Sequence, residues 1–228
     1  MIIAIDGPAS SGKSTTARAV AERLGYPYLD TGAMYRAVAL AFLRAEAEPT
    51  AEAARALLPQ IRLDVRHENG AMRVLLGGAD VTDEIRTQAV GMMASRVSAL
   101  PLVREQLVQE QRRIGRAFAS TGGGVVLDGR DIGTVVFPDA DIKVFMVAEA
   151  NVRARRRLQE LEARGETADF ADVLDEIRQR DARDQARAVA PLRRADDALA
   201  LDSTHYTIDE QVEVVLEAVR ERQKASTV

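Results

Sequence analysis

The sequence predicts an α/β protein in which helices cover both faces of a five-stranded parallel sheet. Short apolar runs alternate with longer segments that have helical spacing, and this alternation is typical of parallel sheets with both faces buried. Most of the apolar runs end in Asp or continue into polar residues, as strands do when their C-terminal ends face a ligand site. With 228 residues, the chain has the length of one such domain with elaborations.

The expected strands are short and largely apolar. They cover about 2–6, 27–30, 124–128, 142–147 and 198–202. The expected helices carry apolar residues at intervals of three and four, the period of an amphipathic helix. They cover about 13–24, 32–45, 51–59, 85–98, 101–118, 151–164, 169–188 and 208–222. The last helix follows Thr207, which forms a capping box with Glu210.

A glycine-rich motif follows the first strand directly. Residues 7–14 read GPASSGKS, which has the spacing of a phosphate-binding P-loop: Gly, four free positions, then Gly-Lys-Ser. The frequencies of these residue types in the chain predict roughly 0.001 accidental matches. Glycine lets the backbone wrap a phosphate closely, and the N–H groups of the turn and of the next helix supply a positive end. The motif therefore predicts binding of a nucleoside triphosphate.

Two side chains of the motif have distinct chemical roles. Lys13 places a charge between the β- and γ-phosphates, so we expect it to be catalytic and to be exposed before a nucleotide binds. Ser14 offers a hydroxyl ligand to Mg²⁺, the expected cofactor alongside ATP as co-substrate. The expected ATP-binding residues are Gly7, Pro8, Ala9, Ser10, Ser11, Gly12, Lys13, Ser14 and Thr15.

One segment interrupts the alternation of strands and helices. Residues 61–82 form two β-patterned runs around Asn69 and Gly70, a pair that favours a two-residue hairpin turn. With the two helices that follow, the hairpin predicts an insertion between the second and third strands of the sheet. We expect this insertion to hold a second substrate, as inserts between core strands do in P-loop kinases.

The composition excludes several classes of protein. The 31 basic residues are balanced by 35 acidic ones, and the net charge of −4 argues against a general nucleic-acid binder. Without cysteine there is no disulfide or thiolate metal site, and the two histidines are too few for a histidine metal cluster. No apolar run approaches the ~18 residues of a membrane span, and the N-terminus begins with a strand instead of a charged signal region. We therefore expect a cytoplasmic protein.

Arginine residues gather where the expected strands end and on one later helix. Arg36 follows the second strand, and Arg130 with Asp131 follows the third. Three further residues share one helix face at i, i+4 and i+7: Arg180, Asp184 and Arg187. Phosphoryl transfer needs fixed cations because negative charge spreads over the equatorial oxygens of the transferred group. These positions are therefore candidates for a second phosphate-binding site.

Simpler interpretations of these patterns stay open at this point. Arg153, Arg156 and Arg157 have the spacing of a solvated helix face. Ion pairing within one helix would explain the spacing of Arg180, Asp184 and Arg187. The DGRD stretch at 128–131 could be a turn that binds no ligand. No carboxylate base is evident beside the P-loop, which favours an acceptor that is itself a phosphate, because its oxygen needs no deprotonation.

Five stretches spread over about residues 2–219 form a specific combination. They read IAIDGPASSGKSTTA, YLDTGAMYRA, EIRTQAV, DGRDIGTVVFPDA and RDARDQARAVAPLRRADDALALDST. Together they resemble the family of bacterial-type cytidylate kinases. The resemblance implies the P-loop NTPase three-layer fold as a single kinase domain over 1–228, with an NMP-binding insertion at about 60–118 and a lid at about 153–168. It also implies direct in-line transfer of the γ-phosphate of ATP to CMP or dCMP.

The resemblance assigns roles to side chains by position. Those implied to contact CMP are Thr31, Arg36, Ser95, Arg104, Arg130, Asp131, Arg180, Asp184 and Arg187. Within this set, Ser95, Arg104 and Asp131 would contact the cytosine base, and Arg130 would bind the acceptor phosphate. Arg180 and Asp184 would address the sugar. Those implied to act on the phosphate in transit are Lys13, Arg130, Arg187 and the lid residue Arg156.

Two other functions remain as alternatives. The same core could phosphorylate UMP, AMP, shikimate or dephospho-coenzyme A, although the long insertion and the GRDIGT stretch disfavour these acceptors. A nucleotide-dependent switch without kinase turnover is the second alternative, although arginines that converge on a second site disfavour it. The expected partners are ATP with CMP or dCMP, with no nucleic-acid polymer and no membrane, and we expect a monomer.

Overall fold

A five-stranded parallel sheet forms the centre of the computed structural model, which describes residues 1–68 and 70–225. The strand order is β2-β6-β1-β7-β8. The strands are β1 (Ile2–Asp6), β2 (Tyr28–Asp30), β6 (Val125–Gly129), β7 (Ile142–Val147) and β8 (Leu199–Asp202). Every bound agrees with the predicted one to within one residue, and the predicted fold class is confirmed.

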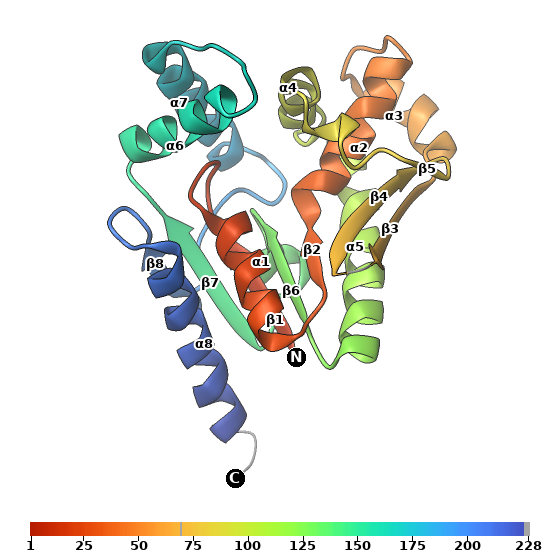
Figure 1. The fold of residues 1–228 in the computed structure, drawn as a ribbon. Helices are drawn as coiled ribbons and strands as arrows, with labels where there is room; N and C mark the ends of the chain where they lie inside the picture. The colour runs from red at the N-terminus through yellow and green to blue at the C-terminus, as the bar shows by residue number, and fades with distance from the viewer. Residues whose placement is uncertain (69, 226–228) are drawn as a thin grey trace.

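Helices cover both faces of this sheet, which gives the molecule three layers (Figure 1). Ile3 and Ile5 on β1 pack against α1 (Lys13–Leu24) and α8 (Ile208–Ala225). Ala4, which points the other way, belongs to the core shared with α2 (Thr31–Arg44) and α5 (Pro101–Gly122). Successive side chains of a strand point to opposite faces, so a continuous apolar run can bury residues in both cores.

The capping box predicted at the start of α8 is confirmed. The Thr207 hydroxyl accepts a hydrogen bond from the Glu210 N–H at 3.3 Å, and the Glu210 carboxylate accepts one from the Thr207 N–H at 2.8 Å. The helix begins at the next residue, Ile208.

The insertion between β2 and β6 carries a second, antiparallel sheet. Its elements after α2 are α3 (Ala51–Leu57), β3 (Leu63–Glu68), β4 (Ala71–Leu76), β5 (Ala79–Asp80), a short 3₁₀ turn η2 (Glu84–Arg86), α4 (Gln88–Val97) and α5. Antiparallel pairing of β3 with β4, in which Glu68 lies opposite Ala71, confirms the predicted hairpin. Gly70 has a φ of 77°, which favours glycine, and Asn69 lies outside the described residues.

Three of the predicted helices of the insertion have different bounds. The helix predicted at 51–59 ends at Leu57, where a 3₁₀ turn, η1 (Leu58–Gln60), begins. The helix predicted to begin at 85 begins at Gln88, because Thr87 caps it by accepting a hydrogen bond from the Val90 N–H. The helix predicted to end at 118 continues to Gly122, where Gly123 with a φ of 72° stops it.

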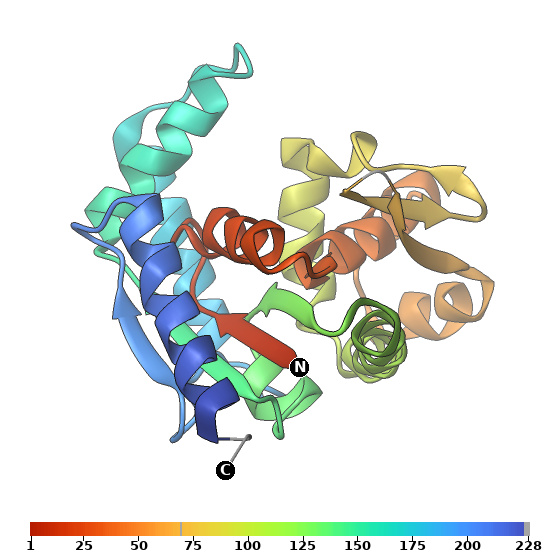
Figure 2. The same ribbon diagram turned by 60° about the horizontal axis from the view of Figure 1, so that its bottom comes forward.

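A helical hairpin lies at the C-terminal edge of the sheet, across from the insertion (Figures 1 and 2). It consists of α6 (Ala150–Glu162) and α7 (Phe170–Gln185), and it has an apolar cluster of its own formed by Ala154, Leu161, Val173 and Ile177. The predicted helix 169–188 is three residues too long at its end. Arg187 therefore lies beyond the helix and not on the predicted helical row.

A π-turn, η3 (Ile132–Val136), follows β6 and the DGRD stretch. Such turns are rare and occur frequently at functional sites. Among residues 1–68 and 70–225, no helix combines the length and apolar character that a membrane span requires.

Candidate active site

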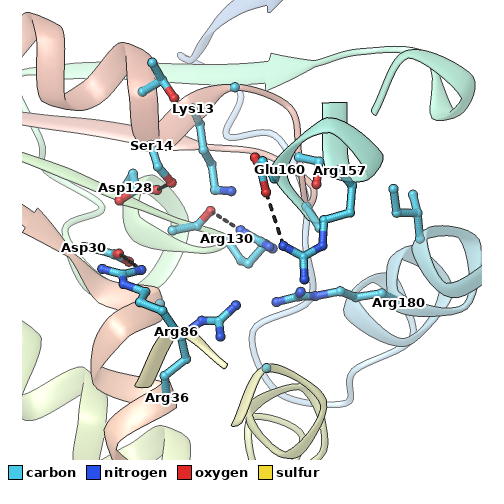
Figure 3. A pocket seen from close by; sticks show the side chains of 18 of the residues that line it. Lys13, Ser14, Asp30, Arg36, Arg86, Asp128, Arg130, Arg157, Glu160 and Arg180 are labelled. Atoms are coloured by element: carbon cyan, nitrogen blue, oxygen red, sulfur yellow. Dashed lines mark hydrogen bonds and ion pairs between the residues drawn. The ribbon is translucent and has the colours of Figure 1, made fainter. Parts of the chain in front are cut away.

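The C-terminal ends of the parallel strands border a cavity of about 560 Å³ between the P-loop, the insertion and the α6–α7 hairpin. Its basic lining residues are Lys13, Arg18, Arg36, Arg86, Arg130, Arg157, Arg164 and Arg180, and its acidic ones are Asp30, Asp128, Glu160 and Glu176. Eight cations thus face four carboxylates in a chain whose net charge is −4. Figure 3 shows that Lys13, Arg130, Arg180 and Arg157 point toward one shared space. The cavity is suited to polyanions.

The P-loop forms part of the lining of this cavity. Six of the nine predicted ATP-binding residues line it, namely Ala9, Ser10, Gly12, Lys13, Ser14 and Thr15. The other three, Gly7, Pro8 and Ser11, do not line it. Gly7 is required by a close approach, because a Cβ there would lie 2.3 Å from the Met146 carbonyl oxygen on β7.

Lys13 is buried, with 6% of its surface exposed, so the expectation that it is exposed before a nucleotide binds is wrong. The loop folds back over it, and its Nζ donates to the Pro8 carbonyl oxygen at 3.3 Å. Burial lowers the pKa of Lys13 to about 7, and the charges of Arg130 and Arg180 add to this effect. A cation in this position is stabilised by an incoming phosphate.

Asp128, at the end of β6, is a site residue that the sequence analysis did not identify. Its carboxylate accepts hydrogen bonds from the Ser14 hydroxyl at 2.6 Å and from the Tyr28 hydroxyl at 2.7 Å. Burial and the nearby Asp30 raise the pKa of Asp128, while Lys13 opposes the rise. Together Ser14 and Asp128 present oxygen donors beside the P-loop, the donor type that Mg²⁺ prefers. The sequence does show that the predicted strand 124–128 ends in Asp128. Placing this residue beside the P-loop, however, requires knowing that β6 lies next to β1.

Arg86 on the insertion is the second residue that was missed. Its Nη1 lies 2.9 Å from the Asp30 Oδ2 at the end of β2, and it lines the cavity. Arg36 lies nearby and donates to the Ile85 carbonyl oxygen at 3.1 Å. Burial lowers the pKa of Arg36 to about 10, and Arg86 contributes to this effect.

A smaller cavity of about 70 Å³ shares Arg36, Arg130 and Arg180 with the larger one. In its wall Arg104 is almost completely buried, and its Nη2 lies 2.5 Å from the Asp131 Oδ2. The Arg104 guanidinium also lies 5.6 Å from the centre of the Tyr35 ring. Two side chains implied to contact a base are therefore held in fixed relation to each other.

Several buried polar atoms around the smaller cavity have no hydrogen-bond partner within the described chain. Those on residues that line the cavity are Tyr35 Oη, Arg104 Nε, Arg180 Nε and Arg187 Nε, and Ser95 Oγ belongs to the neighbour of the lining residue Ala94. Buried polar atoms in native proteins are normally hydrogen-bonded. Unpaired donors and hydroxyls gathered here mark a place suited to a polar ligand. Thr31 also lines this cavity, and its hydroxyl is bound to the Asp128 carbonyl oxygen at 2.7 Å.

Asp184 connects the DGRD turn to α7. Its carboxylate accepts hydrogen bonds from Arg130 Nε at 3.0 Å and from Arg187 Nη2, and only 1% of the residue is exposed. Burial alone would raise the pKa of Asp184, but the three arginines at 130, 187 and 180 lower it. The structure thus brings together the predicted residues from the DGRD turn and the α7 region, although Arg187 lies past the end of α7.

Apart from Gly7, Pro8 and Ser11 of the P-loop, two predicted site residues line neither cavity. Ser95 is buried on α4. Arg156 donates to the Ser203 carbonyl oxygen at 2.6 Å and to the Ser11 carbonyl oxygen at 3.4 Å, so it braces the P-loop from outside the cavity. The neighbouring Arg157 lines the cavity instead. Adjacent helix residues differ by about 100° in direction, and the prediction that Arg156 faces the transferred phosphate does not fit this arrangement.

Arg153 does not lie on a solvated helix face, which was the simpler interpretation of its spacing. It is buried, it forms a two-bonded ion pair with Asp181 at 2.6 and 3.1 Å, and it donates to the Ala9 carbonyl oxygen at 3.2 Å. The first turn of α6 is therefore fastened to both α7 and the P-loop.

The family model described as "Cytidylate kinase" matches residues 3–221. The chain belongs to the cytidylate kinase family. Curated relatives named cytidylate kinase include one from Salinibacter ruber, which is 59% identical over 96% of this chain and 97% of its own length. Others come from Chloroherpeton thalassium (49% identical, 95% and 92% covered) and Geobacter sulfurreducens (46% identical, 99% and 95% covered). Membership in this family agrees with a P-loop that faces a second, polar cavity.

Proposed function

We propose that this cytidylate kinase family enzyme transfers the γ-phosphate of ATP to CMP or dCMP, giving CDP or dCDP and ADP. The observation that carries the proposal is the pair of adjoining cavities. One is strongly cationic and lies at the P-loop, the other contains the buried pair of Arg104 and Asp131, and Arg130 with Arg180 lines both. This arrangement suits two nucleotides whose phosphates meet at the shared arginines.

On the donor side, the P-loop binds the ATP phosphates and Lys13 stabilises the charge between the β- and γ-phosphates. The hydroxyl of Ser14 and the carboxylate of Asp128 fit a Mg²⁺ site, because they are hard oxygen donors 2.6 Å apart beside the loop. When bound, the ion neutralises developing negative charge on the phosphate oxygens.

On the acceptor side, Arg130 binds the phosphate of CMP where the two cavities meet. Arg180, which the sequence analysis assigned to the sugar, joins Arg130 there in this proposal, because it also lines both cavities. An ionised carboxylate only accepts hydrogen bonds, so Asp131 favours the 4-amino group of cytosine and disfavours the carbonyl of uracil. Arg104 contributes donors to the same base, with Ser95 joining after movement of α4. Arg36 and Thr31 complete the pocket, and Asp184 with Arg187 binds near the sugar and the transferred phosphate.

The reaction needs no general base, because the acceptor phosphate oxygen is already an anion. The residues therefore act by placement and by charge stabilisation in an in-line transfer. We propose that the chain is one kinase domain in which the lid at about 153–168 and the insertion at about 60–118 close over the substrates and exclude water. In this proposal it works as a cytoplasmic monomer, and Arg156 acts through the P-loop it braces.

The test is ATP consumption by the purified protein with CMP, dCMP, UMP, AMP or no acceptor. We expect rapid turnover with CMP and dCMP, slower turnover with UMP, and little with AMP or without an acceptor. A preference for AMP, or hydrolysis that is independent of any acceptor, would contradict the proposal.

A further inference from the structure

The last residue of β1, Asp6, carries a buried carboxylate that the proposed mechanism does not use. It directly precedes the P-loop, and only 4% of its surface is exposed. In the sheet it lies between Gly129 on β6 and Phe145 on β7. It lines neither cavity. Asp6 thus lies behind the junction of the P-loop and the DGRD turn.

Both oxygens of this carboxylate bind the backbone that follows Asp131. Oδ1 accepts a hydrogen bond from the Ile132 N–H and Oδ2 accepts one from the Gly133 N–H, each at 2.8 Å. These are the first N–H groups of the π-turn η3, and the first N–H groups of a helical turn have no partner within the turn. The carboxylate therefore fixes the backbone that carries Asp131.

Ion pairing does not account for Asp6. In residues 1–68 and 70–225, no lysine or arginine nitrogen lies within 4.0 Å of its carboxylate oxygens. The side chain of Lys143 packs beside Gly133, but its Nζ binds the Pro138 carbonyl oxygen at 2.5 Å and Asp197 at 2.8 Å. Burying a carboxylate without a cation is costly in free energy. The two hydrogen bonds from the Ile132 and Gly133 N–H groups offset part of that cost.

We propose that Asp6 is a positioning residue for base selection, which sets Asp131 relative to the P-loop by holding the N–H groups of Ile132 and Gly133. The inference rests on the proposed role of Asp131 at the base. The 2.5 Å contact between Asp131 and Arg104 depends on where this turn lies. One carboxylate on the strand that leads into the P-loop thereby couples the position of the phosphate donor to that of the acceptor base.

The test uses Asp6→Asn and Asp6→Ser. Asparagine has nearly the same shape, but its amide nitrogen cannot accept a hydrogen bond, so one N–H of the turn faces a donor. Serine offers one accepting oxygen in less space. For both variants we expect the CMP-to-UMP ratio of kcat/KM to fall by about threefold to tenfold and the KM for CMP to rise about tenfold, since small misplacements cost this much. The KM for ATP should stay within about twofold of the wild-type value.

Two controls separate positioning from general loosening. Ile5→Val shortens a buried side chain on the same strand, which lowers stability without touching either hydrogen bond. It should keep the wild-type CMP-to-UMP ratio. The double variant Asp6→Asn/Asp131→Asn should show the same ratio as Asp131→Asn alone, because Asp6 acts on the base only through Asp131.

The outcomes are distinct. If both Asp6 variants keep the wild-type ratio while Asp131→Asn loses it, the inference about Asp6 is wrong and the proposed function stands. If the wild-type enzyme does not favour CMP over UMP, the proposed base selection fails first and the inference with it. A measurement on the unmodified protein adds a further check: the amide hydrogens of Ile132 and Gly133 should exchange slowly even without CMP, and rapid exchange would overturn the inference.

Discussion

The region around the P-loop and the region around the base pocket contain buried cations of two different kinds. Burial lowers the pKa of Lys13 to about 7 and that of Arg180 to about 10, and within the described chain no carboxylate lies within 4.0 Å of either cationic group. At Arg104, burial also acts to lower the pKa, but Tyr35 and Asp131 outweigh it and raise the pKa. The unpaired cations match a ligand that brings its own negative charge. Arg104, which is paired with Asp131, is suited to a neutral base that is recognised through hydrogen bonds.

This difference has opposite consequences for stability. Removing an unpaired buried cation relieves a desolvation cost, whereas removing one member of a buried ion pair leaves the other without a partner. Variants in the two regions should therefore shift the melting temperature of the ligand-free protein in opposite directions while both impair the reaction.

The largest effect is expected for Lys13→Ala. Its kcat should fall by about a thousandfold or more, because the charge between the β- and γ-phosphates loses the cation proposed to stabilise it. The ligand-free protein should melt at the same or a higher temperature than the wild type. Lys224→Ala, at an exposed position on α8, serves as the control and should leave both values unchanged. An unchanged kcat in a folded Lys13→Ala protein would refute the assignment.

Arg180→Met should have the next largest effect. We expect kcat/KM for CMP to fall by about 10²–10³, or ~2.7–4 kcal/mol, as for other fixed cations at a developing charge. Stability should stay constant or rise by roughly 0.5–2 kcal/mol. Arg183→Met on the exposed side of the same helix is the matched control. A fall in melting temperature with little kinetic change would show that Arg180 is structural.

Asp131→Asn should have a smaller kinetic effect but the opposite effect on stability. It removes the charge paired with Arg104, so we expect the melting temperature to fall. The CMP-to-UMP ratio of kcat/KM should shrink by at least about tenfold, or ~1.4 kcal/mol. Equal losses for both substrates would mean that Asp131 positions phosphate or backbone and does not select the base.

The sequence was sufficient for the strands and for most of the helices. Their apolar patterns have unambiguous periods, and the P-loop motif anchors β1 and α1 at known positions. The burial of Lys13 was not predictable, because it depends on how the loop folds back upon it. Asp128 was missed for a related reason. Its contact with Ser14 requires β6 to pair with β1, and the order of strands in a sheet cannot be inferred from local hydrophobic periodicity.

Side-chain direction was the second limit. The arginine-rich stretch at 153–157 was recognised, but Arg153 is buried against Asp181, Arg156 binds Ser203, and Arg157 faces the cavity. Neighbouring positions on one helix point in different directions, and the side that faces the substrate depends on how α6 packs on α7. Arg187 was correctly placed near Asp184 but incorrectly placed within the helix, since residue spacing alone does not show where α7 ends.

The smallest predicted effect is a pH dependence of stability that arises from Asp6. Burial raises its pKa from 3.8 to about 7, the two backbone hydrogen bonds oppose the rise, and Asp131 adds to it. Between about pH 4 and pH 7 the folded state therefore binds more protons than the unfolded state, so stability falls as the pH rises. Relative to Asp6→Asn, the wild type should lose on the order of 1 kcal/mol or more over this window, roughly 2–4 °C in melting temperature per kcal/mol.

Thermal melts of both proteins at pH 4.5, 5.5, 6.5 and 7.5 (roughly the window in question) measure this difference. Asp139→Asn, an exposed change in the loop after the same turn, should follow the wild type at every pH. A constant difference between the wild type and Asp6→Asn would show that Asp6 titrates outside this range.

The eight cations of the larger cavity also affect the rate at which substrates arrive. A protein with a net charge of −4 repels nucleotides at long range, yet a concave basic surface focuses the electric field at its own mouth. Nucleotides approaching from bulk solution are therefore steered to the cavity. Screening by salt shortens the reach of this field to about 8 Å at 0.15 M ionic strength. Association rate constants for ATP and CMP should consequently decline steeply as salt is added, while dissociation rates change much less.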